Sequence, residues 1–345
     1  MSGRSRVFLM RVGVISRILG IMLMLFSVTL VPPLMLSFWF RDGASNAFGF
    51  TLLLTFSVGL LVWAPVHNIR HDLRIRDGFI ITAMFWLVLA LFGALPFMIS
   101  KASNLSFTDA FFESLSGWTT TGATVITGIE HLPKSILFYR QQLQWLGGMG
   151  IIVLAVAILP MLGIGGMQLF RAETPGPVKD SKLTPRITET AKALWYLYLS
   201  LTIACTLGYW LVGMDVFDAI CHAFATVAIG GFSTYDASIG HFDNPGIELV
   251  AIIFMLISTV NFGLHFFALR HRSLTHYFSD PEVKLLVGLL PVAASLIIGA
   301  LVYSGVYEPL EAVRYGVFEL VSIATTTGFG TADFTLWPFF APTLL

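Results

Sequence analysis

Three short polar loops centred on glycine recur along an otherwise apolar chain, and they limit what this sequence can fold into. Residues 119–124 are TTTGAT, residues 325–331 are TTTGFGT, and a weaker copy at 228–234 is AIGGFST. When Gly122, Gly231 and Gly328 are aligned, Glu113 and Glu319 occupy the same place nine residues upstream. The similarity therefore extends into the segment before each loop, which indicates one structural unit used three times.

The composition places these loops in a membrane protein. Of the 345 residues, 56% are hydrophobic and 12% are charged, and the formal net charge is zero. This balance excludes an ordinary soluble domain and offers no bulk positive charge to hold a nucleic acid. We therefore expect an all-α polytopic membrane protein, because helices satisfy their own backbone hydrogen bonds in the bilayer.

Long apolar stretches predict the membrane-spanning helices, since about 20 residues cross the hydrocarbon core as a helix. The first stretch is too long for a cleaved signal peptide, and its two adjacent prolines predict a kink. The predicted spans are 18–40, 48–66, 78–99, 135–162, 193–212, 247–269 and 285–306.

A shorter apolar segment precedes each polar loop, at 106–118, 215–227 and 308–324. A single Thr-Thr-Thr-Gly segment is typical of a helix end with a glycine cap. Three copies, each after a short helix, favour a different interpretation, because a polar loop at membrane depth is tolerated only inside protein or along a water-filled path. The sequence therefore predicts three re-entrant pore helices with their loops, the first two followed by a returning span.

The distribution of basic residues predicts the orientation. If the spans alternate, the N-terminus and segments 67–77, 166–192 and 270–284 share one side, which holds fifteen of the twenty lysines and arginines. By the positive-inside rule this side is cytoplasmic. The N-terminus is then cytoplasmic, and all three loops open to the outside.

Loops of this kind suit a monovalent cation. A bare cation must exchange its water for oxygen atoms before it crosses, and rings of backbone carbonyls and threonine hydroxyls provide them. Glycine permits backbone conformations that strain other residues. Each pore helix also ends at its loop with the partly negative end of its dipole, which favours a cation over an anion.

Two stretches carry a resemblance to a known family: YRQQLQWLGGMG at 139–150 and IGGFST at 229–234. With the order of span, pore helix, loop and span, the chain resembles the Trk/Ktr/HKT superfamily of potassium transporters, and within it the membrane subunits of bacterial Trk uptake systems. The resemblance implies repeated helix–pore-loop–helix units around a pseudo-fourfold pore, with two extra N-terminal transmembrane helices. It also implies a transporter of potassium rather than an enzyme, with no cofactor.

The resemblance further implies the ligands and the partners. Potassium would be coordinated by the backbone carbonyls of the two residues before each filter glycine, which are Thr120, Thr121, Ile229, Gly230, Thr326 and Thr327. A glycine at position 122 is expected to favour potassium over sodium. Such subunits reside in the bacterial inner membrane as homodimers and carry a cytosolic TrkA-like ring, which binds NAD(H) or ATP/ADP and controls opening.

The family pattern also gives the expected organisation. Superfamily members have four pore units, with a gating loop in the returning helix of the third, so we expect this sequence to end inside the third unit and to lack the fourth. A less selective potassium and sodium pathway and an inactive structural fragment are the alternatives. The expected parts are an N-terminal helix pair at 1–77, pore units at 78–166, 193–269 and 285–345, and cytoplasmic linkers at 167–192 and 270–284.

Several other residues invite a functional interpretation. Glu113 and Glu319 are expected to stiffen the filter through hydrogen bonds rather than to bind the ion directly, and the aligned residue of the second unit is His222, so a ring of carboxylates is not supported. For Arg140 and Arg314, near the external end, snorkelling or ion pairing is the ordinary explanation.

The remaining polar residues give weaker signals. Cys205 and Cys221 are expected to be small buried hydrophobic residues, and His222 and His265 lack the spacing of a zinc-binding helix. The proline-containing segment 171–192 predicts an irregular loop, and this segment and 270–284 are candidate docking surfaces for a cytosolic partner.

Overall fold

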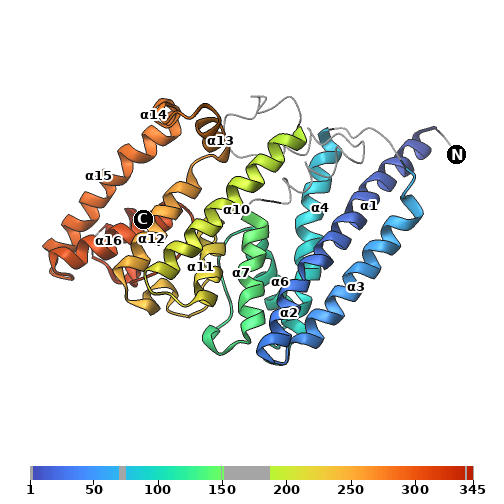
Figure 1. Ribbon diagram of the computed structural model, residues 1–345, viewed down its shortest axis with the longest axis horizontal. Helices are drawn as coiled ribbons and strands as arrows, with labels where there is room; N and C mark the ends of the chain where they lie inside the picture. The colour runs from blue at the N-terminus through green and yellow to red at the C-terminus, as the bar shows by residue number, and fades with distance from the viewer. Residues whose placement is uncertain (1–2, 70–74, 149, 151–186, 339, 345) are drawn as a thin grey trace. The chain divides into compact units, whose positions relative to one another are not determined.

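A computed structural model of the chain describes residues 3–69, 75–148, 150, 187–338 and 340–344 (Figure 1). Within these residues all regular structure is helical, which confirms the predicted all-α class. The chain divides into two compact units. The first contains residues 1–119, 123–125 and 131–192, and the second contains 120–122, 126–130 and 193–345.

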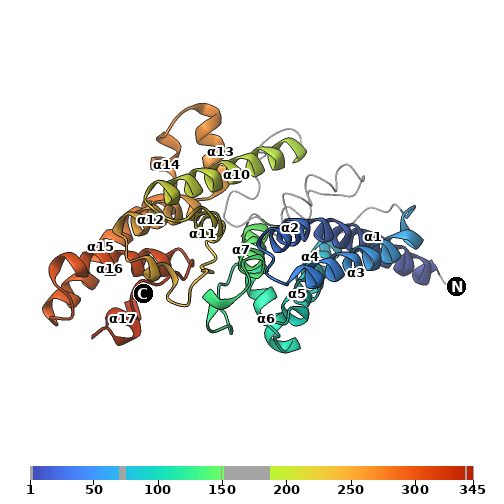
Figure 2. The same cartoon turned by 60° about the horizontal axis from the view of Figure 1, so that its bottom comes forward.

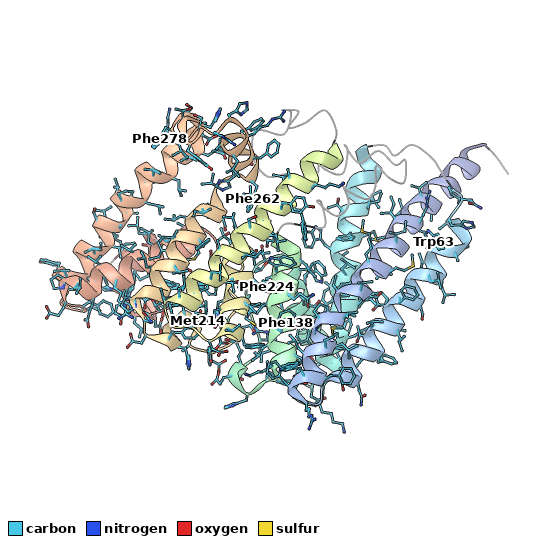
Figure 3. All side chains as sticks on the ribbon, viewed as in Figure 1. Trp63, Phe138, Met214, Phe224, Phe262 and Phe278 are labelled. Atoms are coloured by element: carbon cyan, nitrogen blue, oxygen red, sulfur yellow. The ribbon has the colours of Figure 1, made fainter. Side chains whose placement is uncertain are left out.

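The described helices confirm most of the predicted spans. Among the described residues, five helices are long and apolar enough to cross a membrane, with a sixth if one bent pair is counted as a span. Apolar side chains project from the outer faces of the helices (Figure 3), as expected where lipid replaces water as the solvent. The five are Val12–Phe40, Ser45–Val66, Ile80–Ile99, Lys192–Leu211 and Pro281–Tyr303.

The first unit packs its helices around a hydrophobic core of aliphatic and aromatic side chains. Its first span is interrupted at Leu30, two residues before Pro32, which is close to the place where the adjacent prolines predict a kink. Tyr139 is fully buried and donates a hydrogen bond to the carbonyl of Gly93. The helices are α1 (Gly3–Thr29), α2 (Val31–Phe40), α3 (Ser45–Trp63), the 3-10 helix η1 (Ala64–Val66), α4 (Ile75–Gly93), α5 (Leu95–Ile99), α6 (Phe107–Trp118) and α7 (Lys134–Gly148). The rest of the span predicted at 135–162 lies outside the described residues.

Asp42 ties the turn between α2 and α3 to the start of α7. Its carboxylate accepts hydrogen bonds from the Ser37 hydroxyl, from the amide of Ala44 at 3.2 Å and from the amide of Ser135 at 2.9 Å. Partial burial acts to raise the pKa of Asp42, but the hydrogen bonds from Ser37, Ser135 and Ala44 outweigh it, so the pKa is lowered below its ordinary value. The ionised form is therefore the one that the fold stabilises.

We expect Asp42→Asn to lower the free energy of unfolding by about 1 kcal/mol at neutral pH, because the amide replaces one of the two carboxylate oxygens that accept these hydrogen bonds, and partial exposure to water limits the loss. A lowered pKa in the folded state stabilises the protein above the unfolded value of about 3.9, and this contribution is lost as the pH falls through the folded pKa. The difference in melting temperature between wild type and variant in detergent should thus be constant near neutrality and shrink below about pH 4. A difference that is independent of pH would contradict this role.

The second unit carries the remaining helices. The 3-10 helix η2 (Ile129–His131) lies where the chain passes between the two units. In the second unit α12 packs against α11 and α16, and α15 packs against α16. Its helices are α10 (Ile187–Leu211), α11 (Val216–Val227), η5 (Ser238–Phe242), α12 (Pro245–Thr259), α13 (Phe262–His271), α14 (Thr275–Ser279), α15 (Pro281–Tyr303), α16 (Pro309–Ala324), η6 (Phe334–Leu336) and α17 (Ala341–Leu344).

The straight span predicted at 247–269 is wrong. The segment breaks into α12 and α13, which meet at an angle of 88° (Figure 2). Val260 is extended, and the side chain of Asn261 caps α13 by accepting from the amide of Gly263. His265 then bonds to the carbonyl of Ile257 near the free end of α12. Both halves are apolar, so composition alone does not reveal that one polar residue starts a new helix.

The two predicted linkers are partly helical. In segment 171–192 the helix α10 begins at Ile187, two residues after the last proline, so the expected irregular structure is wrong for 187–192. The rest of that linker lies outside the described residues. Segment 270–284 contains the end of α13, the short helix α14 and the start of α15.

Candidate functional site

The three predicted pore helices are present as short helices that end directly before the polar loops. They are α6, α11 and α16, with 12, 12 and 16 residues. At 1.5 Å per residue they span about 18 to 24 Å, which is less than the roughly 30 Å of a hydrocarbon core. Side-chain caps fix two of their starts: Ser106 accepts from the amide of Asp109, and Asp215 accepts from the amide of Phe217.

The three loops share one backbone conformation. The filter glycines have positive φ angles of 76°, 76° and 80° at Gly122, Gly231 and Gly328. The residues two positions earlier are also left-handed, with φ of 55° at Thr120, 48° at Ile229 and 63° at Thr326. All three of these residues are β-branched, for which a positive φ is unusual and costs on the order of 1 to 3 kcal/mol. A strain repeated at three equivalent places points to a functional site.

The loops meet one another within the second unit. A Cβ atom added to Gly122 would overlap the carbonyl oxygen of Gly230 and would lie 3.6 Å from that of Thr327. A Cβ atom added to Gly231 would overlap the carbonyl oxygen of Thr327. At Gly328 no atom of the described residues lies within 4 Å of the corresponding position. Two of the six predicted ligand carbonyls therefore face the glycine of a neighbouring loop. Coordination of an ion by the six stays a prediction.

Glu113 holds the first loop in the way the sequence predicts. The hydroxyl of Thr124 donates to its carboxylate at 2.9 and 3.0 Å, and the amide of Val125 donates at 3.3 Å. Arg140 of α7 contacts the same carboxylate at 2.7 Å, and both side chains are fully buried. Pairing is thus the correct explanation for Arg140, and snorkelling is wrong, because its guanidinium is not exposed to solvent.

Glu319 holds the third loop in the same manner. Its Oε1 accepts from the amide and the hydroxyl of Thr331, at 2.6 and 3.0 Å, and from the amide of Ala332 at 3.0 Å. Among the described residues its other oxygen, Oε2, has no hydrogen-bond partner. The aligned His222 in α11 contacts the Ser233 hydroxyl at 2.9 Å. All three aligned positions therefore contact their own loop after the filter glycine.

Further contacts brace the segments that follow the filter glycines. Asp236 accepts from the amides of Gly128 and Ile129 at 2.6 and 3.0 Å, and its own amide donates to Glu130. The amide of Gly240 donates to the carbonyl of Gly330 at 3.0 Å. The segment that follows the second loop is thus hydrogen-bonded to the segment that follows the first loop and to the third loop.

Arg314 pairs with acidic residues rather than snorkelling. From α16 it contacts Glu248 of α12 at 2.7 Å and Asp243 at 2.8 Å. The sequence reasoning missed Glu248, Asp243 and Asp236, and it also missed Asp218 of α11. A rule that pairs each pore-helix charge with an opposite charge on a preceding membrane helix would have found Glu248.

The weaker candidates have structural explanations. Cys205 and Cys221 are buried free thiols, as predicted. His265 is hydrogen-bonded to Tyr277 and to the carbonyl of Ile257. The part of the chain that the structure describes contains no group of three His, Cys, Asp or Glu side chains that could hold a metal ion.

Comparison with known proteins gives consistent matches. A family described as TrkH, cation transport protein, matches residues 44–344. The Trk system potassium uptake protein TrkH of Halomonas elongata is 59% identical over 97% of this chain and 70% of that protein, and TrkH of Escherichia coli K12 is 52% identical over 96% and 69%. The crystal structure of the potassium transporter TrkH from Vibrio parahaemolyticus matches with a TM-score of 0.84 at 50% identity, covering 96% of this chain and 68% of that one.

Proposed function

Because this chain belongs to the TrkH family of cation transport proteins, we propose that it conducts potassium ions across the bacterial inner membrane, with its three loops forming part of the selectivity filter. The observation that carries this proposal is the repeated loop backbone. Each loop pairs a left-handed filter glycine with a left-handed β-branched residue two positions earlier, and the loops meet at Gly122 and Gly231. The family is one of transport proteins rather than enzymes.

The chemistry of the loops supports a dehydrated monovalent cation as the substrate. The proposed ligands are backbone carbonyls, which replace hydration water without adding a fixed charge that would trap the ion. They belong to Thr120, Thr121, Ile229, Gly230, Thr326 and Thr327. The C-terminal ends of α6, α11 and α16 directly precede these residues, so each helix dipole adds a partial negative charge.

Uptake of rubidium-86 into liposomes by the full-length protein tests this function, with sodium as the competitor. Rubidium serves as the tracer for potassium. We expect uptake that a tenfold excess of sodium barely reduces. Uptake that sodium suppresses in proportion to its concentration would favour the less selective potassium and sodium pathway. No uptake above that of protein-free liposomes, with the cytosolic partner present, would overturn the proposal.

We propose that the functional form is a homodimer with a cytosolic TrkA-like ring that binds NAD(H) or ATP/ADP and controls opening, and that the N-terminus and the basic segments face the cytoplasm. The similar proteins are named as parts of a Trk system, which implies further components. Segment 270–284 suits docking, because Arg270, Arg272 and Phe278 are exposed around α14. Arg270→Glu with Arg272→Glu is expected to weaken binding of the purified ring at least tenfold, and unchanged binding would exclude this surface.

A further inference from the structure

The second loop is anchored by an acid that the repeat does not predict. In the first and third units the aligned pore-helix residue is Glu113 or Glu319, and each accepts hydrogen bonds from residues two to four positions after its filter glycine. In the second unit the aligned residue is His222, which brings no carboxylate. The repeat therefore leaves the second loop without the acceptor that the other two loops have.

His222 makes a different contact. Its Nδ1 lies 2.9 Å from the carbonyl of Asp218, and because a carbonyl only accepts, Nδ1 is the donor. In the neutral ring Nε2 is then an acceptor for the Ser233 hydroxyl at 2.9 Å. Ser233 in turn accepts from the amide of Tyr235. His222 thus links the loop to the helix through one hydroxyl and donates nothing to the segment beyond it.

Asp218 lies one turn earlier on the same helix and supplies the missing carboxylate. Its Oδ1 accepts from the hydroxyl of Thr234 at 2.8 Å, and its Oδ2 accepts from the hydroxyl of Tyr235 at 2.9 Å. Thr234 is three positions after Gly231, which is the place that Thr331 holds after Gly328. Asp218 is buried, with 8% of its surface exposed, so these hydroxyls compete with little water.

Tyr235, whose hydroxyl contacts Asp218, is itself held in place by neighbouring rings. Its ring stacks on His241 with the ring centroids 3.5 Å apart and an angle of 5° between the planes. Phe242 packs edge-on against both rings. The hydroxyl of Tyr235 is therefore presented to Asp218 by a rigid aromatic stack rather than by a freely rotating side chain.

We propose that Asp218 is the positioning residue of the second loop and performs there, from one turn earlier in its helix, the task of Glu113 and Glu319. The inference rests on the proposed potassium filter. Ile229 has a strained, left-handed backbone conformation. If the loop relaxed out of this conformation, the carbonyls of Ile229 and Gly230 would move. Charge-assisted hydrogen bonds are about twice as strong as neutral ones, so a carboxylate resists that relaxation better than the Ser233 contact alone. Each of the three loops is then held by hydrogen bonds to one carboxylate of its own pore helix.

The test uses the full-length protein in liposomes, with rubidium-86 as the tracer and sodium as the competitor. Asp218→Ala removes both hydroxyl contacts and is expected to raise the KM for rubidium at least tenfold and to lower the preference for rubidium over sodium by a similar factor. Asp280→Ala is the matched control, because it likewise removes a helix-capping carboxylate, but from the start of α15, which is neither a pore helix nor part of a loop. The control should keep the wild-type KM and ion preference.

The decisive variant moves the carboxylate to the aligned position. Asp218→Ala combined with His222→Glu places an acid where Glu113 and Glu319 stand, within reach of the Ser233 hydroxyl, and should restore most of the ion preference. If Asp218→Ala only lowers the amount of folded protein, with KM and preference unchanged, or if the double variant restores nothing, the inference is overturned. A wild type that does not distinguish rubidium from sodium would instead favour the less selective potassium and sodium pathway, and a wild type without uptake would overturn the proposed function.

Discussion

Gly122→Ser is expected to reduce the preference for rubidium over sodium at least tenfold, which corresponds to about 1.4 kcal/mol in relative free energy of binding. The reason is steric. A Cβ atom at position 122 would overlap the carbonyl oxygen of Gly230, so the backbone of one of the two loops must move. Gly230 is one of the six proposed ligands, and a filter that depends on carbonyl placement tolerates such a shift poorly.

The measurement is rubidium-86 uptake into liposomes with increasing sodium, for wild type and variant in parallel. Gly43→Ala is a suitable control, because Gly43 also has a positive φ, of 82°, but no atom of the described residues lies within 4 Å of the position its Cβ would take. Both substitutions place a side chain on a left-handed backbone, which costs about 1 to 2 kcal/mol. Only the substitution at Gly122 pushes on a proposed ligand carbonyl. Equal ion preference in both variants would show that the contact at Gly122 has no role in selectivity.

Arg140→Gln is expected to lower the free energy of unfolding by about 3 to 5 kcal/mol, because it leaves the Glu113 carboxylate buried without its cation. Both partners are fully buried and lie 2.7 Å apart. Glu113→Gln leaves the guanidinium unpaired and should cost a similar amount. Combining the two removes both charges, so the double variant is expected to be more stable than either single variant, with a coupling energy of about 2 kcal/mol or more.

Thermal unfolding of the purified protein in detergent, followed for the four forms of this double-mutant cycle, measures the coupling. The folded fraction of Glu113→Gln should keep the wild-type ion preference, since the amide still accepts from the loop through its oxygen. Arg314→Gln is the comparison variant. Its guanidinium is partly exposed, with 24% of the side chain accessible, so its loss should cost less than that of Arg140. Additive effects in the cycle would show that Glu113 and Arg140 do not stabilise each other.

Much of the fold follows from patterns along the chain. The apolar runs predict five spans that the structure contains, and the two prolines predict an interruption close to Leu30. The short helices α6, α11 and α16 begin and end close to their predicted bounds, because caps, glycines and segment length are local properties. The break at Asn261 could not be predicted in this way, since both halves of the span are equally apolar.

Part of the candidate site could also be predicted from residues that lie close together in the sequence. The three filter glycines are visible in the sequence, and their left-handed backbone follows from the conformational freedom of glycine. The hydrogen bonds of Glu113 and Glu319 also followed from the repeat. Asp218 did not, because the repeat aligns His222 with the two glutamates and the true acceptor lies one turn away.

The sequence by itself determined the class of the protein, its apolar spans, its three pore helices and the glycines of its loops, because hydropathy, helix caps and backbone freedom depend on residues near one another. Only the tertiary structure decided which groups face one another. The carbonyl oxygen of Gly230 leaves no room for a side chain at position 122, and Arg314 of α16 forms an ion pair with Glu248 of α12. These contacts join residues far apart in the chain, and they are set by how the helices pack and by the need to pair every buried charge.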